Sequence, residues 1–459
     1  MENTSKTQSS IIAIIVMMFL FAMISFVTNL AAPFGLIWGN QYSWAGMMGN
    51  MMNFLAYLFM GIPAGIMLTK IGYKKTAILA MAVGFIGLGV QYVSSIVGAD
   101  TAVFTVGGQP VMLNLIIYLL GAFICGFCVC MLNTVVNPML NLLGGGGNRG
   151  NQLIQTGGSL NSLSATLTPL FVGALIGSVT KDTAMSDVSP LLFIAMGVFA
   201  VSIIIIAFAT IPEPHLQKAG EKKEVMEHSP LNFRHTLLGI IAIFFYVGIE
   251  VGIPSQLTFY LAQPESAGGV GLANGAAIGG AIAAIYWMLM LVGRFSSSII
   301  SGKVSTRAQM LFVTTTAIVL LLITIFLPSD LTMSMPAYSV SDGFIMTAGV
   351  PVKCLFIVLC GLCTSVMWGG IFNLAVEGLG KYTAAASGLF MTMVVGGGIM
   401  PFIQNLIANN AGYIASYWLV IAMLAYILYY SLVGCKNVNT DIPVEKFNRK
   451  AVLSLGAFC

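Results

Sequence analysis

Charged residues are scarce in this chain. Asp, Glu, Lys and Arg make up 7% of the 459 residues, whereas 58% are hydrophobic. No charged side chain lies between Lys6 and Lys70, and similar charge-free runs recur as far as Cys435. A water-exposed surface of this size needs charges, so the outer surface must face lipid. This scarcity excludes a soluble enzyme and argues against binding to nucleic acid.

The charge-poor runs have the length of membrane spans. A span needs about 20 mostly apolar residues. Period-2 alternation is absent and the runs are too long for barrel strands, so the spans are expected to be helices. The predicted fold is an all-α integral membrane protein with about twelve transmembrane helices. The runs are 11–38, 44–69, 76–99, 111–140, 150–177, 188–212, 236–262, 268–302, 308–329, 353–378, 382–408 and 412–434.

Basic residues sort to one side of this pattern. When the loops are assigned alternately to the two sides, only Lys181 and Lys353 fall opposite the other loop Lys and Arg residues. Loops rich in Lys and Arg stay in the cytoplasm. We therefore predict a multi-pass protein of the cell (inner) membrane with both termini cytoplasmic. The first apolar run is too long for a signal peptide, so we expect the N-terminus to be retained.

The longest charged stretch, residues 213–235, divides the chain near its middle. It predicts a cytoplasmic linker between two six-helix halves, 1–212 and 236–435, followed by a cytoplasmic tail, 436–459. Loop landmarks repeat with one offset: Lys75 precedes Arg307, and Arg149 precedes Lys381, by 232 residues in each case. A parallel internal repeat predicts a ligand site between the halves near mid-depth. Regular span spacing could also give such matches by chance.

Three charges lie inside apolar runs. A charge in hydrocarbon costs about 3 kcal/mol or more, so each needs a partner, water or a role. Glu250 in the seventh run is predicted to line a central cavity. There it either accepts a hydrogen bond from a solute or titrates as the group that couples the movement of a proton to that of the solute. The alternative is a carboxyl group with a purely structural role. Arg294 and Glu377 are predicted gating residues, either as an ion pair or as two independent charges near the cytoplasmic face.

Amides accompany these charges. Asn133 and Asn137 are one helical turn apart and share a face. A neutral amide both donates and accepts hydrogen bonds, which suits a polyhydroxylated ligand, and Trp368 could stack on the C–H face of a sugar ring. The alternative is that the amides join helices to one another. The other predicted solute-binding residues are Gln155, Asn161, Gln256 and Asn373.

Nothing in the sequence predicts a cofactor, a bound metal or an enzyme. The glycine clusters lack the Lys-Ser/Thr of a phosphate-binding loop. The three histidines, His215, His228 and His235, lie in or next to the linker. The spans are therefore expected to contain neither a nucleophile–base set nor a set of metal ligands.

The segment 61–75 resembles the signature loop of the major facilitator superfamily, which is a cytoplasmic clasp between spans two and three. Thr69 stands where that loop has an Asp. The resemblance implies that Lys70 and Lys74 take part in gating. The matching residues are Gly65, Lys70, Gly72, Lys74 and Lys75.

Further segments resemble, in the same order, the fucose–galactose–gluconate proton symporter family within that superfamily. They are 133–144, 245–255, 293–295, 372–380 and 395–401. The resemblance implies a secondary transporter that imports a small neutral solute, most simply a monosaccharide, by alternating access. It also implies a coupling cation and a protein that functions as a monomer in membrane lipid.

The chain departs from that family at its acids. Members resembling the fucose permease carry an acid on span four and another on span one, but here Asn133 occupies the first position and 27–34 contains no acid. On span five the family has a Gln about one helical turn before an Asn-Ser pair, whereas here Gln155 lies nearly two turns before Asn161. Glu250 is therefore the best proton-coupling candidate, while sodium coupling and uniport stay open. The alternative functions are a drug or metabolite efflux antiporter of the same fold and a non-transporting nutrient sensor.

Overall fold

The computed structural model describes residues 2–42, 45, 48–176, 183–214, 216, 227–263, 265–272, 275–339 and 343–444. The helices of the first part of the chain are α1 (Glu2–Gln41), α2 (Met48–Lys70), α3 (Gly72–Ile96), α4 (Leu113–Leu143), α5 (Gly147–Ile176) and α6 (Ser189–Phe208). Those of the second part are α7 (Arg234–Ala262), α8 (Gly275–Ile300), α9 (Thr306–Phe326), α10 (Lys353–Ala375), α11 (Thr383–Thr392), α12 (Gly396–Ala411) and α13 (Tyr417–Tyr429). Short 3-10 turns are η1 (Pro230–Asn232), η2 (Glu265–Ala267), η3 (Gly380–Tyr382) and η4 (Met393–Val395), and η5 (Tyr430–Gly434) is a π-helical turn.

Within the described residues, eleven helical stretches are long and apolar enough to cross a membrane. In that count α11, η4 and α12 form one stretch, and α13 with η5 forms another. Helix α5 is the twelfth crossing. It is not among those eleven stretches, but it has 30 residues, about 45 Å at 1.5 Å per residue, and packs against α1 and α8. The prediction of an all-α fold with about twelve spans is confirmed.

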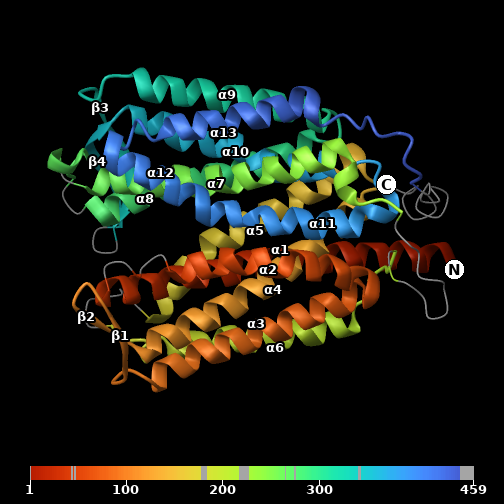
Figure 1. Cartoon of the computed structure of the whole chain (residues 1–459), viewed down its shortest axis with the longest axis horizontal. Coiled ribbons are helices and arrows are strands. Elements are labelled where there is room, and N and C mark those ends of the chain that lie inside the picture. Colours follow the sequence, from red (N-terminus) through yellow and green to blue (C-terminus); the bar gives the residue numbers. More distant parts are fainter. Residues whose placement is uncertain are drawn as a thin grey trace.

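The helices form two bundles (Figure 1). Helices α1–α6 make up the N-terminal half and α7–α13 the C-terminal half. Helix α5 packs on α8 and α10, and α11 packs on α2 and α4, so these two helices join the halves. Helix α7 begins at Arg234, two residues before the predicted boundary at 236. Much of the predicted linker, including 217–226, and most of the predicted tail, 445–459, lie outside the described residues.

The two ends of the bundle differ. Helix α1 begins and η5 ends at one end, here called the termini end (Figure 1). The other end, the hairpin end, carries two antiparallel hairpins, β1–β2 (Ala102–Val106, Gln109–Met112) and β3–β4 (Thr332–Ser339, Gly343–Pro351). These hairpins were not predicted from the sequence, although Gly107 and Gly108 at the first turn have the positive φ angles that tight hairpin turns require. The hairpins follow the third and ninth crossings, which are equivalent positions in the two halves.

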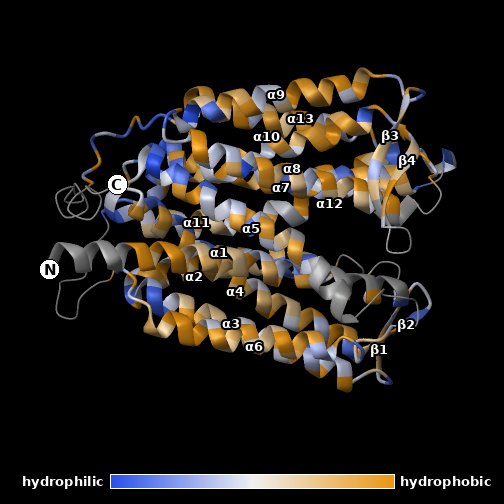
Figure 2. Cartoon of the chain, turned by 180° about the vertical axis from the view of Figure 1, so that it is seen from behind, coloured by the Kyte–Doolittle hydropathy of each residue, from blue (hydrophilic) through white to orange (hydrophobic). Residues whose placement is uncertain are grey.

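Hydrophobic residues predominate along the helices, and hydrophilic residues gather toward the two ends of the bundle (Figure 2). Phe208, Phe312 and Phe326 are 87%, 72% and 73% exposed. Large exposed apolar surfaces are rare on water-soluble monomers, so this band fits a surface in contact with hydrocarbon.

A carboxylate from beyond α6 caps the start of α3. Glu213 accepts the backbone N–H groups of Tyr73 and Lys74 at 2.6 and 2.9 Å. A negative charge is favourable at a helix N-terminus, where N–H groups lack intrahelical partners. Gly72 has φ +87°, and a Cβ there would collide with the Glu213 carboxylate. Thr69 replaces the expected acid of this loop, and Glu213 brings an acid to the loop from a distant part of the chain.

We expect Gly72→Ala to lower the midpoint of thermal unfolding in detergent. The left-handed conformation costs an L-residue about 1–2 kcal/mol, before the collision with Glu213 is counted. Gly89→Ala is the matched control, because the nearest atom to its Cβ is 3.8 Å away. That change should leave the midpoint unaltered or raise it, since Ala suits a helix interior better by about 0.5–1 kcal/mol. Equal midpoints for the two variants would contradict this account of the α2–α3 turn.

Candidate functional site

A charge pair lies between the helices of the C-terminal half. Glu250 lies on α7, about 24 Å along the helix from Arg234 at 1.5 Å per residue. Its Oε1 accepts a hydrogen bond from Nη2 of Arg294 on α8 at 2.9 Å. The two side chains are 16% and 10% exposed, so both charges are largely removed from solvent. Both predicted arrangements of Arg294 are wrong: its carboxylate partner is Glu250 and not Glu377, and it is not an independent charge near the cytoplasmic face.

Arg294 also contacts other helices. Its Nε donates to the carbonyl oxygen of Ser365 on α10 at 3.4 Å. Its Nη1 points toward α5 of the N-terminal half, where the acceptors are Ser162 Oγ at 2.9 Å, the Gly158 carbonyl at 3.3 Å and Asn161 Oδ1 at 3.5 Å. One guanidinium thus joins α8 to α5, α7 and α10.

The predicted amide pair lies on α4 and is hydrogen-bonded. Asn133 donates to the Tyr57 hydroxyl on α2 at 2.8 Å, and Asn137 donates to the backbone carbonyl of Asn133 at 2.9 Å. Trp368 on α10 donates from Nε1 to Asn137 Oδ1 at 3.0 Å, across the boundary between the halves. Asn133 and Asn137 were predicted as a pair on one helix face and Trp368 separately as a stacking ring, and the structure brings the three together.

Tyr246 lies between the amides and the charge pair. It is one helical turn before Glu250 on α7, and its buried phenol lies beside both charges. Its ring centroid is 6.2 Å from that of Trp368, and the Phe390 ring lies 6.0 Å from Trp368. The region therefore combines aromatic faces, neutral amides and one ion pair with no net charge. Such groups can bind a neutral polyhydroxylated molecule.

Two other predicted binding residues are placed less centrally. Gln155 on α5 donates to the Val366 carbonyl on α10 at 2.9 Å, so it joins the two halves next to Trp368. Gln256 lies nearly two turns beyond Glu250 toward the hairpin end and donates to Asn405 on α12 at 3.5 Å. It contacts Asn405 within the C-terminal half.

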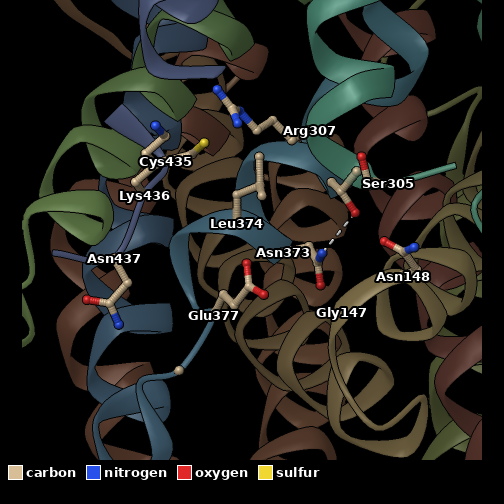
Figure 3. A pocket seen from close by; sticks show the side chains of 12 residues that line it. Gly147, Asn148, Ser305, Arg307, Asn373, Leu374, Glu377, Cys435, Lys436 and Asn437 are labelled. Carbon is tan, nitrogen blue, oxygen red and sulfur yellow. Dashed lines mark hydrogen bonds between the residues drawn. The ribbon is translucent and has the colours of Figure 1, made fainter. Parts of the chain in front are cut away.

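Asn373 and Glu377 lie at the termini end, away from the charge pair. Both line a cleft of about 490 Å³ that is bordered by the first residues of α5 and by the starts and ends of helices in the C-terminal half (Figure 3). Asn373 accepts a hydrogen bond from Asn141 at 2.6 Å and donates to Thr306 at 3.1 Å. Asn373 therefore joins helices across the two halves, which was the alternative interpretation of the amides. The remaining lining residues are Gly147, Asn148, Ser305, Thr306, Arg307, Leu374, Gly378, Cys435, Lys436 and Asn437.

Neutral groups close the two halves at the termini end. Besides the bond between Asn141 and Asn373, Asn151 on α5 donates to Ser301 at 3.0 Å. On the other side of the bundle, α2 and α11 approach so closely that a Cβ on Gly61 or Gly65 would meet the α11 backbone. Of the two predicted gating lysines, Lys70 ends α2 here, and Lys74 contributes its backbone N–H to Glu213.

Several site residues escaped the sequence analysis. Ser162 could have been suggested by its position next to Asn161, but the Tyr57 contact depends on how α2 and α4 pack. His235, expected beside the linker, is buried in the first turn of α7, and its Nε2 lies 3.0 Å from the backbone oxygen of Glu377. Among the residues that the structure describes, no group of three or more His, Cys, Asp or Glu could hold a metal ion.

A twelve-crossing bundle of two halves, with a polar site between them, is the architecture of a membrane transporter. The chain belongs to the Major Facilitator Superfamily, whose family model matches residues 10–394. It is 30% identical over 393 residues to the "Glucose/galactose transporter" of Brucella abortus, covering 84% of both chains. It is 21% identical over 402 residues to the "L-fucose-proton symporter" of Escherichia coli, covering 82% of this chain and 81% of the relative.

Solved structures share the fold. The outward conformation of the Escherichia coli fucose:proton symporter superposes with a TM-score of 0.71 at 18% identity, covering 92% of this chain and 98% of that one. A proton:xylose symporter gives 0.66 at 11% identity, covering 95% and 97%. The resemblance seen in the sequence is confirmed. The protein is a multi-pass membrane transporter and not an enzyme.

We expect Arg294→Met to be strongly destabilising, because it leaves the Glu250 charge buried without its partner. Breaking a buried pair in this way costs about 3–5 kcal/mol. The double variant Glu250→Gln/Arg294→Met should recover most of the loss, since no lone charge is left. Thermal unfolding of the purified variants measures both effects.

Arg307→Met is the matched control for that cycle. Arg307 donates to the backbone carbonyls of Ser431 and Leu432 rather than to an acid, so its loss should cost about 1–2 kcal/mol. An Arg294→Met variant that unfolds no earlier than Arg307→Met would argue against the importance of the ion pair.

Proposed function

We propose that this protein is a proton-coupled importer of a hexose, either glucose or galactose. The observation that carries the proposal is the cluster of Asn133, Asn137 and Trp368 beside the Glu250–Arg294 pair, where the two halves meet. The relatives named as glucose/galactose transporters in Brucella abortus and Helicobacter pylori support the class of substrate. The relative named as an L-fucose-proton symporter supports proton coupling.

The amide cluster is suited to exchange its internal hydrogen bonds for bonds to a sugar. Asn137 is fully buried and Asn133 is 6% exposed, so hydroxyl groups that replaced Tyr57 and Trp368 as partners would also lie in a largely dry site. Trp368 is only half-buried and presents a large apolar ring, which suits the C–H face of a pyranose. When the sugar leaves, Asn133 and Asn137 re-form their hydrogen bonds with Tyr57 and Trp368, so that no buried polar group is left unpaired.

Glu250 is the proposed proton-binding group. The family acids of spans one and four are missing, and Glu250 is the carboxylate that faces the amide cluster. A proton on Glu250 neutralises the anionic member of the ion pair. Because Glu250 and the proposed sugar site share Tyr246 as a neighbour, occupancy of one can affect the other.

Charge distribution supports an inner-membrane protein with its termini end in the cytoplasm. Asp100 and Asp330 lie at the hairpin end together with Lys353. Closure at the termini end then corresponds to an outward-facing state, ready to receive sugar from outside. All proposed site residues come from one chain, which supports function as a monomer in lipid. The basic residues of the termini end include Lys70, Lys74, Lys75, Arg149, Lys303, Arg307, Lys381 and Lys436.

Uptake of labelled D-glucose, D-galactose and L-fucose into proteoliposomes tests the proposal directly. We expect an inward proton gradient, but not a sodium gradient, to accelerate uptake of glucose or galactose by tenfold or more, on the order of the ratio that one pH unit supplies. Glu250→Gln should lose this acceleration and keep exchange of sugar between the two sides, since exchange needs no net proton movement. Uptake that responds to neither gradient would refute coupling, and no uptake of any of the three sugars would refute the substrate class.

Trp368→Ala should weaken apparent sugar affinity by about tenfold. It removes the indole ring that is proposed to stack on the C–H face of the sugar, and aromatic contacts contribute about 0.5–1.5 kcal/mol beyond their area burial. Trp418→Ala is the control, because Trp418 is 48% exposed on α13 and lies outside the site. The concentration dependence of uptake distinguishes them, and equal affinities in the two variants would remove Trp368 from the proposed site.

A further inference from the structure

The hydrogen bonds of Arg294 are divided between the two halves of the transporter. In the C-terminal half it donates to the carboxylate of Glu250 and to the carbonyl of Ser365. In the N-terminal half its three acceptors are neutral oxygens of α5, from Gly158, Asn161 and Ser162. The guanidinium therefore has one anionic partner, Glu250, in its own C-terminal half. Its partners in the N-terminal half are all neutral.

The α5 acceptors are held toward Arg294. Asn161 donates from Nδ2 to the carbonyl of Phe21 on α1 at 2.9 Å, which leaves its Oδ1 directed at the guanidinium. Gly158 has no side chain to cover its carbonyl, and a Cβ there would lie 3.3 Å from Cδ of Arg294. These features allow the arginine to lie closely along α5.

The other titratable groups around Glu250 are phenols. They are Tyr246 on the same helix, Tyr286 on α8 and Tyr57 on α2. A phenol is neutral at physiological pH. Arg294 is thus the charged group that faces Glu250 among the described residues, and a proton on Glu250 leaves the guanidinium with neutral acceptors alone.

We propose that Arg294 is a tie between the two halves whose hold on α5 is controlled by the charge of Glu250. When Glu250 is ionised, the pair is neutral within the C-terminal half, and the α5 contacts can be released as the termini end opens. When Glu250 is protonated, the arginine charge depends on the oxygens of α5, because a buried cation needs acceptors. The empty protonated protein is then held closed at the termini end.

Sugar releases this tie. Its hydroxyl oxygens are acceptors of the same kind as Ser162 Oγ, so a bound sugar can replace α5 as the partner of Arg294. Opening with a proton on Glu250 therefore requires sugar, and a proton does not cross alone. This inference rests on the proposed proton symport and explains how movement of the proton is made conditional on sugar.

The test compares two serine variants of α5. Ser162→Ala removes the shortest contact between α5 and Arg294, at 2.9 Å. Ser159→Ala is the matched control, because Ser159 is buried on the same helix and donates to the Gln155 carbonyl of its own helix. The full-length variants are reconstituted into vesicles that contain a pH-sensitive dye. Inward proton flux is measured under a pH gradient without sugar, and uptake of D-glucose and D-galactose is measured in parallel.

We expect Ser162→Ala to raise sugar-independent proton flux by about tenfold or more, since the loss of one hydrogen bond to a charged group costs about 1.5–3 kcal/mol. Ser159→Ala should match the wild type. If the flux through Ser162→Ala equals that through Ser159→Ala, the tie is refuted. If the wild type takes up neither sugar, the proposed substrate is refuted instead, because the flux comparison contains no sugar.

Folding of the variants is checked by gel filtration and thermal unfolding. Should Ser162→Ala fail to fold, Gly158→Leu replaces it. A Cβ at this position lies 3.3 Å from Cδ of Arg294, so the rest of the leucine side chain displaces the arginine from α5 without removing a hydroxyl. The same rise in sugar-independent proton flux is expected. A folded Gly158→Leu protein with wild-type flux would overturn the proposal.

Discussion

Hydrocarbon offers no hydrogen-bonding partner to a polar group, and this constraint governs the whole structure. Backbone groups are satisfied within helices, so the chain crosses as helical rods. Side chains that carry charge or amides must find partners on neighbouring helices. Arg294 meets this requirement with five oxygens drawn from α5, α7 and α10. The site between the halves is thus held together by the same contacts that any conformational change must exchange.

The choice of neutral groups at the termini end has a physical reason. Amide–amide and amide–hydroxyl bonds, such as Asn141 with Asn373 and Asn151 with Ser301, are weaker than buried ion pairs and leave no lone charge when they separate. Two helix pairs can then part at modest cost. The stronger interaction, between Glu250 and Arg294, lies within one half and need not break when the halves move.

The sequence was sufficient to predict the membrane fold, the number of crossings and the Asn133–Asn137 face, because hydropathy and helical periodicity are local properties. The partner of Arg294 was not predictable in this way. Whether it meets Glu250 or Glu377 depends on rotation and tilt of α7, α8 and α10, which no run of residues records. The hairpins were not predicted, because strands of four to nine residues are too short to interrupt a pattern of long apolar runs, although Gly107 and Gly108 mark a turn. Glu213 reaches α3 from a segment 140 residues away, a contact visible only after folding.

Asn141 and Asn373 are 232 residues apart, the same offset that separates Arg149 from Lys381. If the halves descend from one six-helix ancestor that worked as a symmetric pair, this bond descends from a residue touching its own copy on the dyad. A lysine or a glutamate at such a spot would have repelled itself, whereas a carboxamide is its own complement. Once the two halves were fused into a single polypeptide, their sequences could differ. Only then could a cation such as Arg294 arise in one half without an equivalent residue in the other.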